Sequence, residues 1–182
     1  MTSQQPQSDI VHSAYALIDR LKQFKTTFPA VVRNFSPVDT LWKPDPQSWS
    51  VLEIVGHMLD EEIEDFRTRV FMTLNDPEAD WPPIDPQGWA VSKNYQSKDL
   101  QDQLTRWINE RQSSLKQLTE LKDPDWSSTK AHPHFGPMSA IGLLAAWCAH
   151  DALHLRQLAR RLHQLAIRDA NSDPAVRYAG DG

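Results

Sequence analysis

Apolar residues recur every third or fourth position in four segments of this chain, which is the spacing that forms one face of an α-helix. Each segment lies between prolines, which remove a backbone N–H and interrupt helix interiors. The four proline-free windows are residues 7–28, 47–76, 87–123 and 138–173. Each window is long enough for a long amphipathic helix. The pattern therefore predicts an all-α chain that folds as a four-helix bundle.

The second and fourth windows carry the clearest helix signals. Ser50 and Glu53 form a capping-box pattern, in which a serine oxygen and a glutamate carboxylate satisfy backbone N–H groups at a helix start. The apolar stripe that follows is Leu52, Val55, Leu59, Ile63, Phe66 and Val70. The fourth helix is expected from about Met138 to Ile167 and is the most apolar. Glycine is scarce, and no Asn-Gly or Asp-Gly pair lies between strand-like runs, so the pattern gives no hairpin signal.

A long connection, at about residues 76–96, is expected between the second and third helices. It holds four prolines and two tryptophans. Connections of this length are uncommon in compact domains and are often functional, or pack across a bundle end. Tryptophans in such loops usually anchor the loop to the helices, and they can also wall a pocket.

Composition narrows the class of protein. The 182 residues predict a single domain over residues 1–182, with about eight polar residues at the N-terminus and about twelve residues at the C-terminus lying peripherally. The net charge of −5 provides no basic excess for neutralising phosphates, so no nucleic-acid partner is expected. The single cysteine excludes an intramolecular disulfide and a multi-cysteine metal site. Because no signal peptide or membrane-spanning run is recognisable, a soluble, cytoplasmic protein without a membrane partner is expected.

Three of the seven histidines lie in apolar helical stretches. His150 and His154 are spaced i, i+4 in the fourth helix, so both imidazoles face one side and can ligate one metal ion. His57 lies within the apolar stripe of the second helix, where an imidazole needs a partner. Together the three rings would supply three nitrogen ligands and leave a coordination position open, as in catalytic zinc sites. The alternative places the i, i+4 pair on the polar edge of its helix.

Other residues near these histidines carry weaker signals. Glu61 follows His57 by four positions and could ligate a metal, act as a base or orient a ring, or it could be a solvated acid. Gln157 could orient water or a ring N–H, or lie exposed at the surface. Cys148 is expected to point away from the site as a core thiol, and Asp151 to make a helix-packing or loop contact.

The remaining four histidines lie outside these stretches. His132 and His134, in the loop before the fourth helix, are expected to cap the bundle end, with a place at a site entrance as the alternative. His12 and His163 are expected at the surface.

Taken together, these motifs resemble the DinB-like family of metal-dependent bundle proteins over nearly the whole chain. The resemblance is carried by WSVLEIVGHMLDEE, the IDPQGW loop, Arg111, Asp125-Trp126 and HPHFGPMSAIGLLAAWCAHDALHLRQL with its H-D-x2-H-x2-Q pattern. A histidine pair alone is unspecific, whereas this ordered set is specific. One departure is His134, where an acidic residue is commoner in the family.

The resemblance implies an up-down-down-up four-helix bundle, in which the second and third helices run parallel across the long loop. It also implies a divalent metal ion, zinc or nickel, held by His57, His150 and His154. Family members are frequently homodimers. Some are transferases or isomerases that use low-molecular-weight thiols, and the family name implies no DNA binding.

Three functional hypotheses follow. The leading one is a metal-dependent enzyme acting on a small-molecule substrate, as a low-molecular-weight-thiol-dependent S-transferase or, in a variant, as a hydrolase that activates water. The second is a non-catalytic stress-response protein that binds a metal or small molecule without turnover. The third is a plain bundle whose histidines are satisfied polar groups of the core. The sequence assigns a catalytic role to no particular residue.

Overall fold

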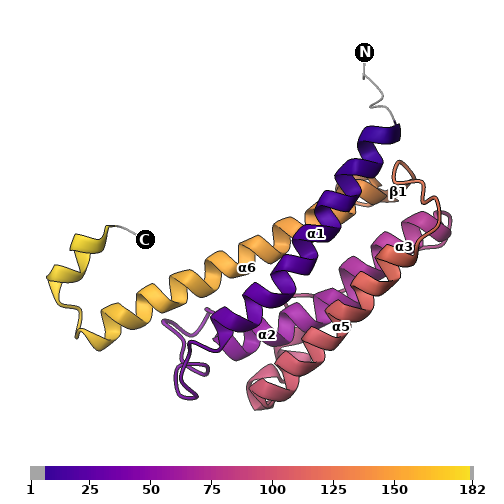
Figure 1. Ribbon diagram of the computed structural model, residues 1–182. Coiled ribbons are helices and arrows are strands. Elements are labelled where there is room, and N and C mark those ends of the chain that lie inside the picture. The colour runs from indigo at the N-terminus through magenta and orange to yellow at the C-terminus, as the bar shows by residue number, and fades with distance from the viewer. Residues whose placement is uncertain (1–6, 181–182) are drawn as a thin grey trace.

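Four long helices run side by side in the computed structural model, which describes residues 7–180 (Figure 1). The second of them consists of three consecutive parts, the middle one a π-helix. In chain order the long helices are α1 (Gln7–Val32), then α2 (Val51–Asp60) with the π-helical segment η1 (Glu61–Arg67) and α3 (Thr68–Asn75), then α5 (Leu100–Glu120) and α6 (Ala140–Asp169). The predicted all-α four-helix bundle is confirmed.

The second and third long helices run parallel, because their C-terminal ends meet at the same end of the bundle. Lys130, which follows α5, donates a hydrogen bond through Nζ to the carbonyl oxygen of Pro77, which follows α3, at 2.7 Å. α1 begins and α6 begins at that same end, where Ala14 and Ala140 share a buried cluster with Leu118. Both therefore run opposite to the middle pair, which gives the up-down-down-up order (Figure 1).

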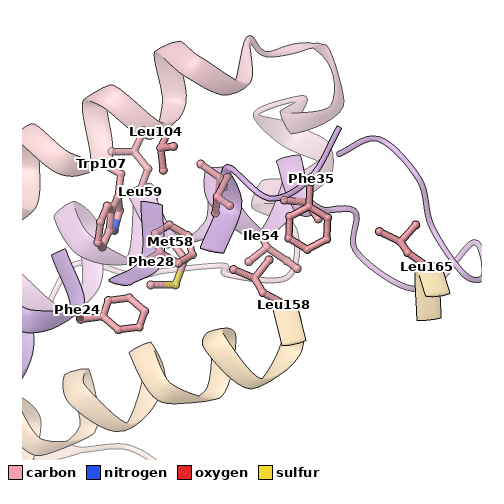
Figure 2. Close-up of a cluster of buried hydrophobic side chains, with 13 residues drawn as sticks. Phe24, Phe28, Phe35, Ile54, Met58, Leu59, Leu104, Trp107, Leu158 and Leu165 are labelled. Atoms are coloured by element: carbon pink, nitrogen blue, oxygen red, sulfur yellow. The ribbon is translucent and has the colours of Figure 1, made fainter. Parts of the chain in front are cut away.

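The bundle has two large buried apolar clusters, one toward each end, and a third, smaller cluster lies in the long connection. In the cluster of Figure 2, the rings of Phe28 on α1 and Trp107 on α5 have centroids 4.7 Å apart. Met58 from α2 and Leu158 from α6 complete the same cluster. All four long helices thus contribute their apolar faces, as the helical periodicity requires.

The helix starts follow local capping chemistry. The Oγ atom of Ser50 accepts a hydrogen bond from the backbone N–H of Glu53 at 3.2 Å, and the Glu53 carboxylate accepts from the N–H of Ser50 at 2.7 Å. This confirms the capping box predicted for the second helix. Ser139 caps α6 in the same manner, since its Oγ accepts from the N–H of Gly142 at 3.1 Å. The fourth helix therefore begins at Ala140, two residues later than expected from Met138.

Two features differ from the sequence pattern. A two-stranded antiparallel hairpin, β1 (Thr129–His132) and β2 (Gly136–Ser139), precedes α6 although no hairpin was signalled. Its turn contains no paired glycine; Gly136, with φ of 71°, supplies the positive dihedral at the start of β2. α1 also continues past its proline-free window, because Pro29 lies in the last turn and the missing N–H interrupts only one helical hydrogen bond.

The long connection between α3 and α5 is anchored on α2. It contains two short helical turns, α4 (Trp89–Ser92) and η2 (Tyr95–Ser97). The hydroxyl of Tyr95 donates to Asp60 Oδ2 at 2.5 Å, and the Tyr95 ring lies so close to Gly56 that a Cβ atom there would be 2.8 Å from it. The expected packing of an aromatic loop residue against the helices is therefore present, with a glycine that makes room for it.

A short exposed helical turn, η3 (Pro174–Ala179), follows α6. The polar residues 1–6 and 181–182, expected at the periphery, lie outside the described residues. Within residues 7–180, no helix combines the length and apolar character that crossing a membrane requires.

Candidate metal centre

Three histidines converge where α2 faces α6. The Nε2 atom of His150 lies 3.1 Å from Nε2 of His57 and 3.0 Å from Nε2 of His154. His57 comes from α2, and the other two project from successive turns of α6. The structure thus brings together all three residues that the sequence singled out, and excludes the alternative in which the α6 pair lies on a polar edge away from His57.

The arrangement of these nitrogens fits a metal ion better than a hydrogen-bond network. One hydrogen on His150 Nε2 can serve only one of its two neighbours well, yet both lie at about 3 Å. Two imidazole nitrogens bound tetrahedrally to one zinc ion at about 2.0–2.1 Å would lie about 3.4 Å apart. Within residues 7–180, this is the only group of three metal-ligating side chains whose donor atoms come so close together.

Burial keeps the three imidazoles neutral, which is the form that ligates metals. Burial, with a smaller effect of His154, lowers the pKa of His57 to about 3. Burial and the two neighbouring imidazoles lower the pKa of His150 to about 2. The pKa of His154 is also lowered by burial. No proton therefore has to leave these rings before an ion binds at neutral pH.

Gln157 fixes the tautomer of His154. Its amide Oε1 lies 2.8 Å from Nδ1 of His154, so that nitrogen carries the hydrogen and Nε2 keeps its lone pair toward the other histidines. The role of orienting a ring N–H, one of two considered for Gln157, is the one that the structure supports. Such outer partners orient metal-ligating histidines and raise their basicity.

Glu61 is buried beside His57 and is not a solvated acid. Its Oε1 lies 3.9 Å from Nδ1 of His57, and neither atom has a hydrogen-bond partner among the described residues. Burial, and then the charge of Asp65, raise the pKa of Glu61 to about 8. Asp65 is itself buried and forms an ion pair with Arg69. The two acids lie about one turn apart in the π-helical segment η1, so the charge of Asp65 acts on Glu61.

The three histidines lie on the wall of a cleft of about 1120 Å³ between α6, the start of α2 and the long connection. Trp49, from the loop before α2, covers His57 with ring centroids 4.6 Å apart. Arg156 and Arg160 line the cleft from α6, are exposed, and form no ion pair with any described residue. A small molecule in this cleft would therefore meet the histidines and two free positive charges.

Behind the histidines, a buried ion-pair network joins three helices. Arg111 on α5 is fully buried and binds Asp151 on α6 through two hydrogen bonds of 2.7 and 2.9 Å. Its Nε donates to Glu62 of η1 at 2.9 Å, and Glu62 also accepts from Ser114 at 2.7 Å. Asp151 is thus a helix-packing residue, as expected, and not a ligand. The network fixes α6 next to η1 at the level of His150.

Of the other candidate residues, all but His163 lie away from the histidines. Cys148 is half-buried and its thiol contacts the carbonyl of Leu17 at 3.4 Å, while burial raises its pKa to about 11. His132 and His134 belong to the hairpin and line a different cavity. His12 is exposed, as expected, whereas His163 is half-buried and lines the histidine cleft.

Sequence reasoning missed three residues that contribute to the site, Asp65, Arg156 and Arg160. Asp65 follows Glu61 by four positions, and this spacing could have identified it, but the acidic run reads as a solvated face. Trp49 directly precedes the capping serine, and the sequence placed it among the loop tryptophans that anchor a loop or wall a pocket; it lines the cleft. The arginines Arg156 and Arg160 carry no signal in the sequence, because exposed arginines are common on helices.

Fold and site together define a four-helix bundle with an open, three-histidine centre. The chain belongs to the DinB superfamily, whose family model matches residues 20–158. Among solved structures, YfiT from Bacillus subtilis superposes with a TM-score of 0.67 over 89% of this chain and 92% of that one, at 16% identity. YfiT is described as a probable metal-dependent hydrolase with an unusual four-helix bundle topology. No protein in the curated set matches the chain by sequence.

Proposed function

We propose that this protein is a metal-dependent enzyme that transfers a low-molecular-weight thiol to a small electrophilic substrate. The observation that carries the proposal is the convergence of three neutral Nε2 atoms on the wall of a cleft. His57, His150 and His154 would hold a divalent ion, zinc or nickel, and three protein ligands leave a position for a reactant. When bound, such an ion supplies a Lewis acid that lowers the pKa of a coordinated thiol or water.

The residues around the histidines have distinct parts in this proposal. Gln157 holds the His154 ring in the ligating tautomer through the 2.8 Å contact at Nδ1. Glu61 lines the cleft, and its Oε1 lies 3.9 Å from His57 Nδ1, where the carboxyl can orient that ring. Trp49 covers His57 and limits access of water from that side.

The charge of the cleft favours an anionic reactant. Arg156 and Arg160 lie at its wall without an ion-pair partner among the described residues, and the histidines are neutral. Among the lining residues, Glu61 carries the one carboxyl group. A small thiol that carries carboxylates fits this environment, since arginine binds carboxylate with two parallel hydrogen bonds.

A second candidate is hydrolysis of a small molecule. It is favoured by the description of YfiT as a probable metal-dependent hydrolase and by the buried carboxyl of Glu61 near the histidines. In this reading water replaces the thiol as nucleophile. The hypothesis of a non-catalytic protein that binds a metal or small molecule predicts the same metal content, but no turnover.

The first test is elemental analysis of untagged protein purified without chelator, beside His150→Ala and the control His12→Ala. We expect about one zinc or nickel ion per chain in the wild type and in the control, and a loss in His150→Ala. The absence of metal in all samples, even after incubation with zinc or nickel and dialysis, would overturn the proposal. The exposed His12 shows whether any histidine replacement has the same effect.

The second test is turnover by the metal-loaded protein. Conjugation of 1-chloro-2,4-dinitrobenzene is measured with and without a carboxylated thiol, and hydrolysis of 4-nitrophenyl acetate is measured without thiol. Metal-dependent rate above background that requires the thiol supports S-transfer, whereas thiol-independent ester cleavage supports the hydrolase. Metal without either activity favours the non-catalytic reading. The predicted homodimer is tested on the same samples by light scattering.

A further inference from the structure

A second cavity of about 1030 Å³ lies at the hairpin end of the bundle and takes no part in the proposed function. Its walls come from the hairpin β1–β2, from η1 and α3, from the start of α6 and from the long connection. We refer to it as the hairpin cavity. It is separated from the histidine cleft by Phe66, which lines the cavity while its ring centroid lies 4.9 Å from that of His150. The cavity has the size of a small-molecule site.

The cavity contains a buried positive charge without a counter-ion. Lys130 on β1 is only 8% exposed, and its Nζ donates to the neutral carbonyl of Pro77 at 2.7 Å. No carboxylate lies within ion-pair distance of Lys130 in the described part of the chain. An ammonium group needs compensation when it is buried, and here two of its three hydrogens remain available.

The neighbouring groups are also donors. The indole N–H of Trp81 is buried and has no acceptor among residues 7–180. His132 accepts backbone N–H groups of His134 and Phe135 at Nδ1, at 3.1 and 3.3 Å, so its hydrogen is on Nε2. Donors with too few acceptors predict a ligand that supplies acceptor atoms.

Much of the remaining wall is apolar and aromatic. Trp81 carries Arg69 over its ring at 4.8 Å and Lys130 at 5.7 Å, so the positive charges and the aromatic surface are adjacent. Phe66 and Met138 add apolar surface. The charge of Arg69 is compensated by its ion pair with Asp65, so Lys130 is the free cation of the described cavity wall.

We propose that the hairpin cavity binds a small organic anion, namely a carboxylate carried on a flat apolar group. The carboxylate accepts hydrogen bonds from Lys130 and from the indole of Trp81, and the flat group packs on the aromatic wall. Two exposed acids, Glu78 and Asp80, also line the cavity. Neither forms an ion pair with Lys130 among the described residues, and because both are exposed, water screens their charge. The site is independent of the metal and of the function proposed for the cleft.

The test is isothermal titration calorimetry with 2-naphthoate as probe and 2-naphthylmethanol as its neutral counterpart. We expect 2-naphthoate to bind at least about tenfold more tightly than the alcohol, because the hydroxyl oxygen can accept a hydrogen bond from Lys130 but carries no negative charge to pair with it. Lys130→Met should weaken binding of the carboxylate by about tenfold or more, whereas Lys130→Arg should retain most of it. Lys22→Met, at an exposed lysine of α1, should have no effect.

Two further variants locate the site and guard against misfolding. His150→Ala removes the candidate metal centre, and binding of 2-naphthoate should persist in it. Trp81→Phe keeps an aromatic ring but removes the orphan N–H, and should weaken binding several-fold even if Lys130→Met does not fold. Equal affinities for carboxylate and alcohol, unchanged affinity in folded Lys130→Met and in Trp81→Phe, loss of binding in His150→Ala, or no binding at millimolar probe would each overturn the proposal.

Discussion

The amide oxygen of Gln157 and the Nδ1 nitrogen of His154 lie 2.8 Å apart across one turn of α6. This contact directs the His154 lone pair at Nε2 toward the other two histidines. Replacing Gln157 by leucine removes the acceptor and leaves the ring free to rotate or to change tautomer. We expect Gln157→Leu to lower the affinity for zinc by about 10–100-fold, measured by competition with a chelator of known affinity.

The matched control for this prediction is Gln101→Leu, at an exposed position of α5. It should bind zinc as the wild type does. Equal affinity in wild type and Gln157→Leu would show that the 2.8 Å contact does not orient a ligand.

Breaking the buried ion-pair network should strongly destabilise the fold. Arg111→Met leaves the carboxylates of Glu62 and Asp151 buried without their cation, which costs roughly 3–5 kcal/mol. For a chain of this size the melting temperature should fall by about 6–20 °C. Arg106→Met on the exposed face of the same helix should change it little. A similar small shift for both variants, by calorimetry, would contradict the assignment of the network as a structural element.

The contact between Gly56 and Tyr95 predicts a coupling between α2 and the long connection. Gly56→Ala places a Cβ atom 2.8 Å from the Tyr95 ring and should cost roughly 1–3 kcal/mol in urea unfolding. In a Tyr95→Ala background the same substitution meets no ring and should cost little, or stabilise through the higher helix propensity of alanine. An equal cost in both backgrounds would show that the ring does not determine the need for glycine.

The neutral histidines predict a loss of stability in acid for the metal-free protein. Their pKa values are lowered in the fold, to about 3 for His57 and about 2 for His150, from 6.5. Below the unfolded value the unfolded chain binds more protons, so the free energy of unfolding decreases as the pH falls from 6.5 toward these folded values. Glu61 acts oppositely, because its pKa is raised to about 8, and its contribution is lost as the pH rises from 4.5 through 8.

Comparing wild type with His150→Gln separates the two effects, since both proteins retain Glu61. Urea unfolding in chelator at about pH 7.5 and about pH 5.5 should show the larger acid-induced loss in the wild type. An equal or larger loss in the variant would mean that His150 does not titrate as a buried neutral group.

The sequence predicted the parts of the site that lie on one element. The i, i+4 spacing of His150 and His154 fixes their common face, because helix geometry alone determines it. The meeting of these residues with His57 depends on how α2 and α6 are placed by the bundle, and the ordered motifs anticipated it. The capping box at Ser50 was likewise local and is confirmed.

The features that the sequence did not predict arise from tertiary contacts. Ile63 and Phe66, expected in the apolar stripe, are only half-buried, while Glu61, Glu62 and Asp65 are buried. A run of acidic residues usually forms a solvent-exposed helix face. The sequence does not show that Arg111, which is 49 residues away, binds Glu62. The hairpin was missed because its turn uses Pro133, His134 and Phe135, which carry no standard hairpin signal.

The π-helical segment η1 has a consequence for how this helix tolerates insertions and deletions. In an ordinary α-helix, one added residue rotates everything beyond it by about 100° and moves the downstream side chains off their face. A π-helical turn absorbs an added residue locally, so α2 and α3 keep their packing while Glu61 and Glu62 both point inward, one beside His57 and the other to Arg111. The helix formed by α2, η1 and α3 can therefore gain or lose one residue, and with it one inward-facing acid, within this segment. The core packing of α2 and α3 would not change.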